Sequence, residues 1–234
     1  MPTTHYWALV PAAGVGNRMA STIPKQYLPL AGEPVIVHTL RTLLSHSHIS
    51  GLAVVVSAED EWWSSVTAHL KTAKPLWTVI GGAERCHSVL NGLAALRAHA
   101  DHNDWVLVHD AARPCLTQDD LDRLFFELMD DPVGGLLAVP VRDTLKRAEN
   151  TQRIKITVDR SQLWHALTPQ MFQLGRLYDA LQAAIDRGLL VTDEAAAMEI
   201  AGWAPRLIEG RATNMKITRP EDLALAEFYL TRNK

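Results

Sequence analysis

Near the N-terminus the chain reads Ala8-Leu9-Val10-Pro11-Ala12-Ala13-Gly14-Val15-Gly16-Asn17-Arg18-Met19 and continues to Pro24-Lys25-Gln26. The apolar run from Tyr6 to Val10 is typical of a buried parallel strand, and Pro11 ends it because proline has no N–H to donate to a ladder. The small residues that follow remove side-chain bulk, so successive backbone N–H groups can form a concave donor set for phosphate oxygens. Arg18 and Lys25 add two cations. We therefore predict a strand that leads into a phosphate-binding loop.

Two familiar phosphate motifs do not account for this loop. The dinucleotide motif G-x-G-x-x-G requires a third glycine where Met19 stands, and the Gly-Lys-Ser/Thr ending of the Walker loop is absent. An isolated Gly-Val-Gly is more often an ordinary turn, but two spaced cations after it favour phosphate binding. With its downstream Pro24-Lys25, the loop resembles that of the sugar-nucleotidyltransferase family.

Length, composition and charge indicate the broad class of protein. The 234 residues, 47% of them hydrophobic, suit one α/β domain spanning residues 1–234. A formal charge of −3 argues against a broad nucleic-acid or anionic-membrane surface, so we expect small partners and local cationic sites. No apolar run approaches the ~18 residues of a membrane span. Two cysteines are too few for a disulfide scaffold and no signal-type segment is visible, so we expect a cytoplasmic protein.

Strand and helix patterns alternate along the chain, which predicts an α/β fold. Such alternation favours parallel strands joined by right-handed crossovers. The expected strands are 6–10, 52–56, 77–80, 105–109 and 135–141, and the expected helices are 34–44, 60–70, 85–100, 121–129, 174–187 and 220–231. Loops that follow parallel strands share one edge of the sheet, where such folds bind ligands. The first loop, Gly81–Arg85 and Asp110–Pro114 should therefore converge.

The pattern changes after residue 142. Apolar Ile154, Ile156 and Val158 alternate with polar residues after a polar turn, which predicts a hairpin arm over 143–160 that projects from the domain. Farther along, Thr192 is expected to cap a helix that extends to residue 201. Short strands are expected at 206–209 and 214–217.

Asp110 is the candidate metal ligand, because it follows a strand at the expected ligand edge. Magnesium binds through one or two carboxylates together with substrate phosphates, so a single aspartate suffices. A structural pair with Arg113 is the alternative. The Gly81-Gly82 pair with Ser88 is equally explained by a turn before a helix or by a place for a flat base. The histidines have no metal-ligand spacing, and Ser88 lacks the surroundings of a hydrolase nucleophile.

Further motifs extend the resemblance over nearly the whole chain. In order they are Gly81-Gly82-Ala83-Glu84-Arg85 with Ser88, His109-Asp110-Ala111-Ala112-Arg113-Pro114, Pro140-Val141-Arg142-Asp143-Thr144, Leu163-Trp164-His165-Ala166-Leu167-Thr168-Pro169-Gln170, Thr192-Asp193-Glu194-Ala195, and Glu209-Gly210-Arg211 through Asn214-Met215-Lys216-Ile217-Thr218. Together they closely resemble the 2-C-methyl-D-erythritol 4-phosphate cytidylyltransferase family of the non-mevalonate isoprenoid pathway. The resemblance implies a Rossmann-like three-layer fold with a mostly parallel sheet. It also implies magnesium-dependent transfer of CMP from CTP to a polyol phosphate by a homodimer.

The resemblance also implies roles for individual residues. It assigns the triphosphate to Ala12, Ala13, Gly14, Gly16, Arg18 and Lys25, the cytosine and ribose to Gly82, Ala83 and Ser88, and the metal to Asp110. It assigns the acceptor to Arg113, Thr144, Arg160, Thr168, Thr192, Asp193 and Lys216. Arg18 and Lys25 would stabilise the transition state, since no protein nucleophile is needed for in-line attack on the α-phosphorus. Ala83 stands where relatives carry a polar residue, so any base contact there must use backbone.

Two alternatives remain open from the sequence. A cytidylyltransferase for ribitol 5-phosphate would need similar phosphate-binding residues. A non-catalytic nucleotide-binding regulator would not need Arg18, Lys25 and Asp110 together. The arm over 143–160 is expected to cross a dimer interface and to deliver Arg160 to the partner's site.

Overall fold

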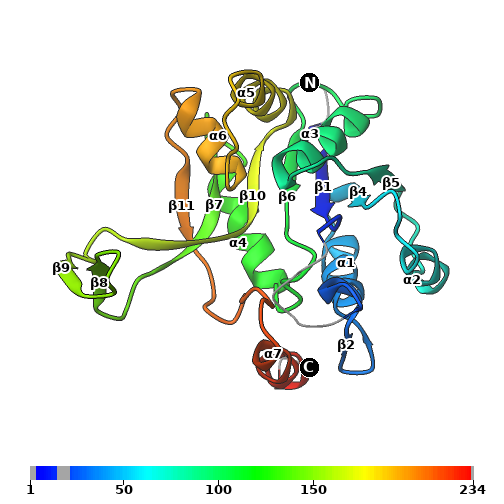
Figure 1. Cartoon of the computed structure of the whole chain (residues 1–234). Coiled ribbons are helices and arrows are strands. Elements are labelled where there is room, and N and C mark those ends of the chain that lie inside the picture. Colours follow the sequence, from blue (N-terminus) through cyan, green and yellow to red (C-terminus); the bar gives the residue numbers. More distant parts are fainter. Residues whose placement is uncertain (1–3, 15–21, 233–234) are drawn as a thin grey trace.

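A seven-stranded sheet with the order β11-β7-β10-β6-β1-β4-β5 forms the centre of the molecule (Figure 1). The computed structural model describes residues 4–14 and 22–232. The strands are β1 (Tyr6–Pro11), β4 (Ile49–Val56), β5 (Leu76–Ile80), β6 (Trp105–Val108), β7 (Gly134–Pro140), β10 (Trp164–Gln173) and β11 (Arg206–Glu209). Strand β10 is antiparallel to β6 and β7, and the other neighbouring pairs are parallel. The predicted α/β fold with a mostly parallel sheet is confirmed.

Helices cover both faces of this sheet. They are α1 (Val35–Ser45), α2 (Trp63–His69), α3 (Arg85–Leu96), α4 (Gln118–Leu128), α5 (Leu174–Asp186) and α6 (Glu194–Ile200). Helix α7 (Glu221–Arg232) lies away from the sheet and packs in a smaller cluster with Leu30 and Val35 (Figure 1). Alternate residues of β1 point to opposite faces: Ala8 and Val10 pack with α1 and α4, whereas Trp7 and Leu9 pack with α3 and α5. The sheet therefore has a buried core on each side, which is the expected three-layer arrangement.

Helix α4 begins with a polar first turn, which the apolar pattern of the sequence did not include. The Thr117 hydroxyl accepts a hydrogen bond from the Asp120 N–H at 3.2 Å, and the Asp120 carboxylate accepts one from the Thr117 N–H at 3.3 Å. This capping box satisfies two N–H groups that the helix itself leaves unpaired. The helix consequently begins three residues before the predicted Leu121, at Gln118.

In the second half two sequence expectations were wrong and one strand was missed. Strand β10 was not predicted, because Pro169 interrupts its pattern; the register of β10 against β7 shifts at this point, between Ala166 and Gln170. Helix α6 is capped by Asp193, not by Thr192, since the Asp193 carboxylate accepts from the Ala196 N–H at 3.0 Å. Residues 214–217 form no strand and are held by single hydrogen bonds, such as Ile217 N–H to the Ala112 carbonyl at 2.8 Å.

The predicted hairpin over 143–160 is present. Strands β8 (Leu145–Ala148) and β9 (Ile154–Val158) pair antiparallel and project from the body of the molecule (Figure 1). Two of their apolar side chains face solvent, since Ile154 is 66% exposed and Ile156 is 53% exposed. A two-stranded hairpin of this kind is marginal by itself in water, and burial of this apolar face would stabilise it.

The smaller elements are β2 (Pro29–Leu30), β3 (Glu33–Pro34) and a 3-10 turn at Lys25–Tyr27. No helix in the described part of the chain has the length and apolar character needed to cross a membrane.

Candidate active site

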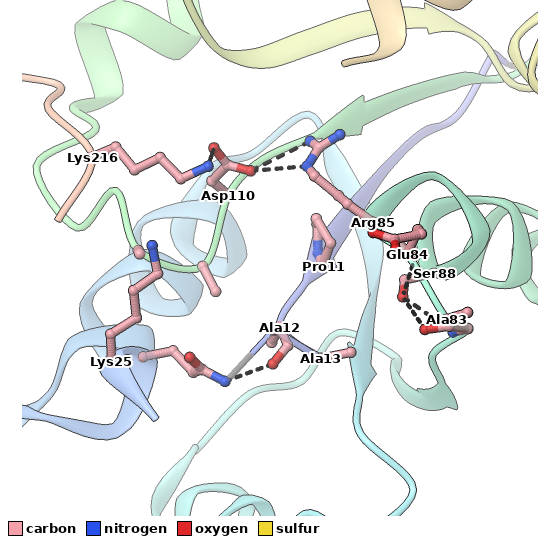
Figure 2. A pocket seen from close by; sticks show the side chains of 15 residues that line it. Pro11, Ala12, Ala13, Lys25, Ala83, Glu84, Arg85, Ser88, Asp110 and Lys216 are labelled. Atoms are coloured by element: carbon pink, nitrogen blue, oxygen red, sulfur yellow. Dashed lines mark hydrogen bonds and ion pairs between the residues drawn. The ribbon is translucent and has the colours of Figure 1, made fainter. Parts of the chain in front are cut away.

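A cavity of about 300 Å³ lies among the segments that follow β1, β5 and β6, and its lining side chains are drawn in Figure 2. The three loops predicted to converge all reach it. Its lining residues are Pro11, Ala12, Ala13, Gly14, Lys25, Gln26, Gly82, Ala83, Glu84, Arg85, Ser88, Asp110, Ala111, Ala112 and Lys216. The sheet topology therefore brings nine of the predicted site residues, Ala12, Ala13, Gly14, Lys25, Gly82, Ala83, Ser88, Asp110 and Lys216, to one cavity.

The first loop leaves β1 in a fixed direction. The Ala12 N–H donates to the Val55 carbonyl at 2.7 Å, and the Ala12 carbonyl accepts from Gln26 Nε2 at 2.6 Å. These bonds hold Ala12 at the end of the strand, so Ala13 and Gly14 face the cavity without bulky side chains. Gly16 and Arg18, both predicted to bind the triphosphate, lie outside the described residues.

Lys25 and Lys216 enter the cavity from the same side, opposite Ala83 and Ser88 (Figure 2). The Lys25 ammonium donates to the Ile217 carbonyl at 2.9 Å, which ties the two lysine-bearing segments together. A compact ammonium group on a flexible stem suits contact with phosphate oxygens. The structure thus places Lys25 and Lys216 at one wall of the cavity.

The Gly81–Ser88 segment forms a turn before α3 and also lines the cavity, so the two interpretations of its sequence do not exclude each other. The Gly82 N–H donates to the Ser88 hydroxyl at 3.1 Å, and that hydroxyl donates to the Glu84 carbonyl at 3.2 Å. Ser88 therefore closes the turn before α3. The turn also needs glycine, since a Cβ on Gly82 would lie 2.5 Å from the His87 Cβ. Gly82 and Ala83 still line the cavity with backbone groups.

Asp110 lies at the centre of a cluster of charges. Its Oδ2 atom is 2.9 Å from Lys216 Nζ and 3.4 Å from Arg113 Nε, and its Oδ1 atom is 3.3 Å from Arg85 Nη2. Burial by itself would raise the pKa of Asp110, but the charges of Arg85, Lys216 and Arg113 outweigh burial and hold that pKa well below its ordinary range. Asp110 is consequently ionised, and the predicted structural pair with Arg113 is present alongside its exposure to the cavity.

His109 fixes the backbone beside Asp110 from within the core. The Arg113 carbonyl can only accept, so His109 Nε2 donates to it at 3.1 Å, and Nδ1 then accepts from the Thr168 hydroxyl at 2.9 Å. The Thr168 oxygen in turn accepts from the Asp110 N–H at 3.1 Å. Burial lowers the pKa of His109 to about 4, so the ring is neutral. Thr168 is buried by these contacts next to Asp110.

The other predicted acceptor residues do not line the cavity. Arg113 donates from Nη1 to the Asn214 carbonyl at 2.8 Å and lies behind Asp110. Asp193 caps α6 and accepts from Gln170 Nε2 at 2.9 Å. Thr192 is exposed just before that cap. Thr144 and Arg160 are exposed at the start and the end of the arm segment, where it leaves and rejoins the domain.

Arg85 and Glu194 are charged residues of this site that the sequence analysis did not assign. The Arg85 guanidinium contacts Glu194 through Nη1 to Oε1 at 2.7 Å and Nη2 to Oε2 at 3.2 Å. Glu194 is only 2% exposed, so Arg85 compensates a carboxylate that is almost fully removed from water. The available signal was their position in motifs at the ligand edge, in Gly81–Arg85 and Thr192–Ala195.

Known proteins resemble this chain over almost its whole length. Residues 6–232 match the sequence family IspD: 2-C-methyl-D-erythritol 4-phosphate cytidylyltransferase. The chain belongs to this family. The 2-C-methyl-D-erythritol 4-phosphate cytidylyltransferase of Pseudomonas fluorescens strain Pf-5 is 56% identical over 220 residues, which cover 93% of this chain and 92% of that protein. The enzyme of the same name from Pseudomonas aeruginosa is 55% identical over 219 residues, covering 93% of each chain.

Solved structures agree with this family assignment. A crystal structure of 4-diphosphocytidyl-2C-methyl-D-erythritol synthase superposes with a TM-score of 0.84 at 41% identity, covering 97% of this chain and 99% of that one. The cytidylyltransferase of Francisella tularensis gives a TM-score of 0.83 at 31% identity, covering 97% and 100%. The predicted resemblance and the nucleotidyltransferase class are therefore confirmed, and a non-catalytic regulator is disfavoured.

Proposed function

We propose that the cavity transfers CMP from CTP to 2-C-methyl-D-erythritol 4-phosphate. The products are 4-diphosphocytidyl-2-C-methyl-D-erythritol and pyrophosphate. A phosphate oxygen of the acceptor attacks the α-phosphorus of CTP, and the bond between that phosphorus and the bridging oxygen to the β-phosphorus breaks. Pyrophosphate leaves with the bonding electron pair. The observation that carries this proposal is the convergence of Gly14, Lys25, Asp110 and Lys216 on one cavity in a chain of this family.

The nucleotide end of the cavity comprises the first loop and the Gly81–Ser88 turn. The backbone of Ala13 and Gly14, with Gly16, Arg18 and Lys25, would hold the triphosphate. The base and ribose would lie against Gly82 and Ala83, which line the opposite wall. Ala83 has no polar side chain, so any hydrogen bond that it makes to cytosine comes from its backbone.

The charges of the cavity favour the reaction because two anions must approach each other. Asp110 and Glu194 supply two negative charges, whereas Arg85, Arg113 and Lys216 supply three positive ones. This cluster has one net positive charge, and Lys25 adds another at the adjacent wall. Fixed cations of this kind stabilise the charge that grows on the equatorial and leaving oxygens in the transition state.

Asp110 is the residue that would hold Mg²⁺. It provides a hard, ionised oxygen ligand in the cavity, and the described residues contain no cluster of three or more His, Cys, Asp or Glu side chains suited to a metal. One carboxylate fits a magnesium ion whose other ligands are substrate phosphates and water. When bound, the ion would neutralise triphosphate charge and so assist departure of pyrophosphate.

The acceptor would bind on the side of Asp110 that faces Arg113, Thr168 and Lys216. Thr192 and Asp193 directly precede α6. Asp193 accepts a hydrogen bond from Gln170, which follows Thr168 by two residues in β10. Thr144 and Arg160 lie at the base of the arm. We infer a homodimer in which the arm of each chain covers its exposed isoleucines against the partner and brings Arg160 to the partner's acceptor site.

We also infer a cytoplasmic location. Cys86 and Cys115 are both buried and free, which is common in compartments that keep thiols reduced.

Pyrophosphate release tests this function and its acceptor together. CTP and Mg²⁺ are supplied with 2-C-methyl-D-erythritol 4-phosphate, ribitol 5-phosphate or a sugar 1-phosphate in parallel reactions. We expect release to be fastest with the methylerythritol phosphate. Faster release with ribitol 5-phosphate would move the assignment to that acceptor, and no release with any of them would contradict catalysis.

A further inference from the structure

Arg85 joins three loops of the cavity through one side chain. It begins α3, directly after the turn assigned to the nucleotide base, and its guanidinium contacts Asp110 after β6 and Glu194 at the start of α6. Figure 2 shows the Arg85 side chain extending across the cavity wall to Asp110. Three parts of the site that are distant in sequence are therefore coupled electrostatically at this residue.

The two anions hold Arg85 unequally. The shortest distance to Glu194 is 2.7 Å, whereas the distances to Asp110 are 3.3 Å from Nη2 and 3.4 Å from Nε. Charge-assisted hydrogen bonds are strongest near 2.7 to 2.9 Å, so the contact with Glu194 dominates. The guanidinium is thus shared between the two carboxylates but held principally by Glu194.

Glu194 is fixed in this position by the backbone around it. Gln170 of β10 accepts from the Ala195 N–H at 2.7 Å and donates to Asp193 at 2.9 Å, which anchors the start of α6 to the sheet. Glu194 itself is 2% exposed, and Arg85 is its ion-pair partner among the described residues. An anchored, buried carboxylate can therefore hold the mobile end of a long arginine side chain.

The position of Arg85 determines how accessible Asp110 is to another cation. Asp110 Oδ2 already faces Lys216 and Arg113, so Oδ1, which faces Arg85, is the oxygen with fewer cations around it. A divalent cation there would be repelled by a guanidinium drawn fully onto Asp110. A guanidinium drawn toward Glu194 leaves Oδ1 freer to bind.

We propose that Glu194 is a positioning residue that draws Arg85 toward itself and so keeps Asp110 available to a divalent cation. This inference rests on the proposed function, in which Asp110 holds Mg²⁺. Without the charge of Glu194, Arg85 pairs with Asp110 alone and competes with the metal. Glu194 would then set the metal requirement of the enzyme although it does not line the cavity.

Binding of Mn²⁺ tests the proposal without measuring catalysis. The full-length protein is titrated with Mn²⁺ in the presence of CTP and without acceptor, and free Mn²⁺ is followed by electron paramagnetic resonance. We expect Glu194→Gln to weaken Mn²⁺ binding about tenfold, the factor by which one neighbouring charge commonly changes the affinity of a carboxylate for a proton. The Mg²⁺ concentration needed for half-maximal pyrophosphate release should rise in parallel.

A double variant separates positioning from simple loss of structure. In Glu194→Gln/Arg85→Gln the competing cation is gone, so Mn²⁺ should bind at least as tightly as to the parent. Glu194→Asp keeps the charge and should stay closer to the parent than Glu194→Gln does. Glu199→Gln, an exposed change on the same helix, should leave Mn²⁺ binding unchanged.

The outcomes distinguish this inference from the proposed function. Unchanged Mn²⁺ binding in folded Glu194→Gln would overturn the inference, and so would a double variant that binds as weakly as the single one. If Glu194→Gln does not fold, the test rests on the double variant. Mn²⁺ binding by the double variant that is weaker than binding by the parent would overturn the inference. If Asp110→Asn binds Mn²⁺ as the parent does, the metal role of Asp110 fails instead.

Discussion

Lys216 Nζ lies 2.9 Å from Asp110 Oδ2 and joins a segment near the C-terminus to the loop after β6. The same segment reaches the first loop, because the Ile217 carbonyl accepts from Lys25 Nζ at 2.9 Å. Lys25, assigned to the triphosphate, and Lys216, assigned to the acceptor, are therefore linked through the same C-terminal segment. Changes at Lys25, Asp110 or Lys216 should affect the reaction more than the fold, except where they leave a buried charge uncompensated.

Replacing Lys25 by alanine should lower turnover far more than it weakens CTP binding. An ammonium beside the triphosphate stabilises charge that grows in the transition state, and such interactions act mainly on kcat. We expect a loss of about a hundredfold, or ~3 kcal/mol, by analogy with removal of one electrostatic donor. Steady-state kinetics with CTP titrations measure this, and Arg18→Ala should behave alike. Exposed Lys71→Ala is the matched control; near-normal turnover in both site variants would refute the catalytic roles.

Asp110→Asn should suppress magnesium-dependent activity while the protein still folds. The amide keeps the size of the side chain but loses the charge that attracts a hard cation. It also leaves Arg113 and Lys216 without their anion, so the melting temperature should fall. Magnesium titrations of pyrophosphate release and thermal melts by circular dichroism measure both effects. A maximal rate and magnesium dependence equal to the parent's would make Asp110 a purely structural residue.

Charging the apolar face of the arm should separate the proposed dimer. Ile154 and Ile156 point to one face of β9, whereas Lys155 points to the other. The double change Ile154→Asp/Ile156→Asp should shift the protein from dimer to monomer in sedimentation experiments and reduce activity. Lys155→Ala serves as the control on the opposite face. A parent that sediments as a monomer would disprove the dimer.

Subunit exchange tests whether Arg160 acts across that interface. Inactive Lys25→Ala and Arg160→Ala proteins are mixed under conditions in which labelled subunits demonstrably exchange. A shared site gives each heterodimer one cavity with intact Lys25 and intact Arg160 from different chains, so activity should reappear. Verified exchange without recovery would show that both residues serve their own chain.

The free energy of unfolding should decrease as the pH falls below about 6.5, in part because of His46. Burial lowers the pKa of His46 from 6.5, although Asp122 opposes the shift at 3.1 Å. The unfolded chain then binds the proton more readily than the folded chain, so acid favours unfolding by at most about 1.4 kcal/mol per pH unit from this group. Urea unfolding at pH 8 and pH 5.5 measures the slope. His46→Gln should flatten it, and an unchanged slope would remove His46 as a cause.

The parts of the cavity that the sequence predicted are those encoded by local patterns. Small residues after β1 specified the first loop, and Asp110 directly follows a strand whose apolar run is clear. Because parallel strands end at one edge, the convergence of these loops followed from the order of elements alone. The arm was equally visible, since Ile154 and Ile156 alternate with polar neighbours.

The parts that sequence did not predict depend on contacts between distant segments. The pairing of Arg85 with Glu194 arises only when α6 is placed beside the start of α3, and neither local pattern encodes that placement. Thr192 and Asp193 are both good capping residues, so composition did not decide between them. The alternation at 214–217 favoured a strand, but in the folded chain these residues bond to loops and to the Arg113 side chain.

Product analysis by ³¹P NMR shows whether this cavity transfers CMP to a polyol phosphate. The parent protein is incubated with CTP, Mg²⁺ and 2-C-methyl-D-erythritol 4-phosphate, beside folded Lys25→Ala and Asp110→Asn proteins. We expect the parent to convert CTP into equal amounts of pyrophosphate and a new diphosphate diester, and both variants to form far less of each. Formation of inorganic phosphate without the diester, or equal product from all three proteins, would contradict it.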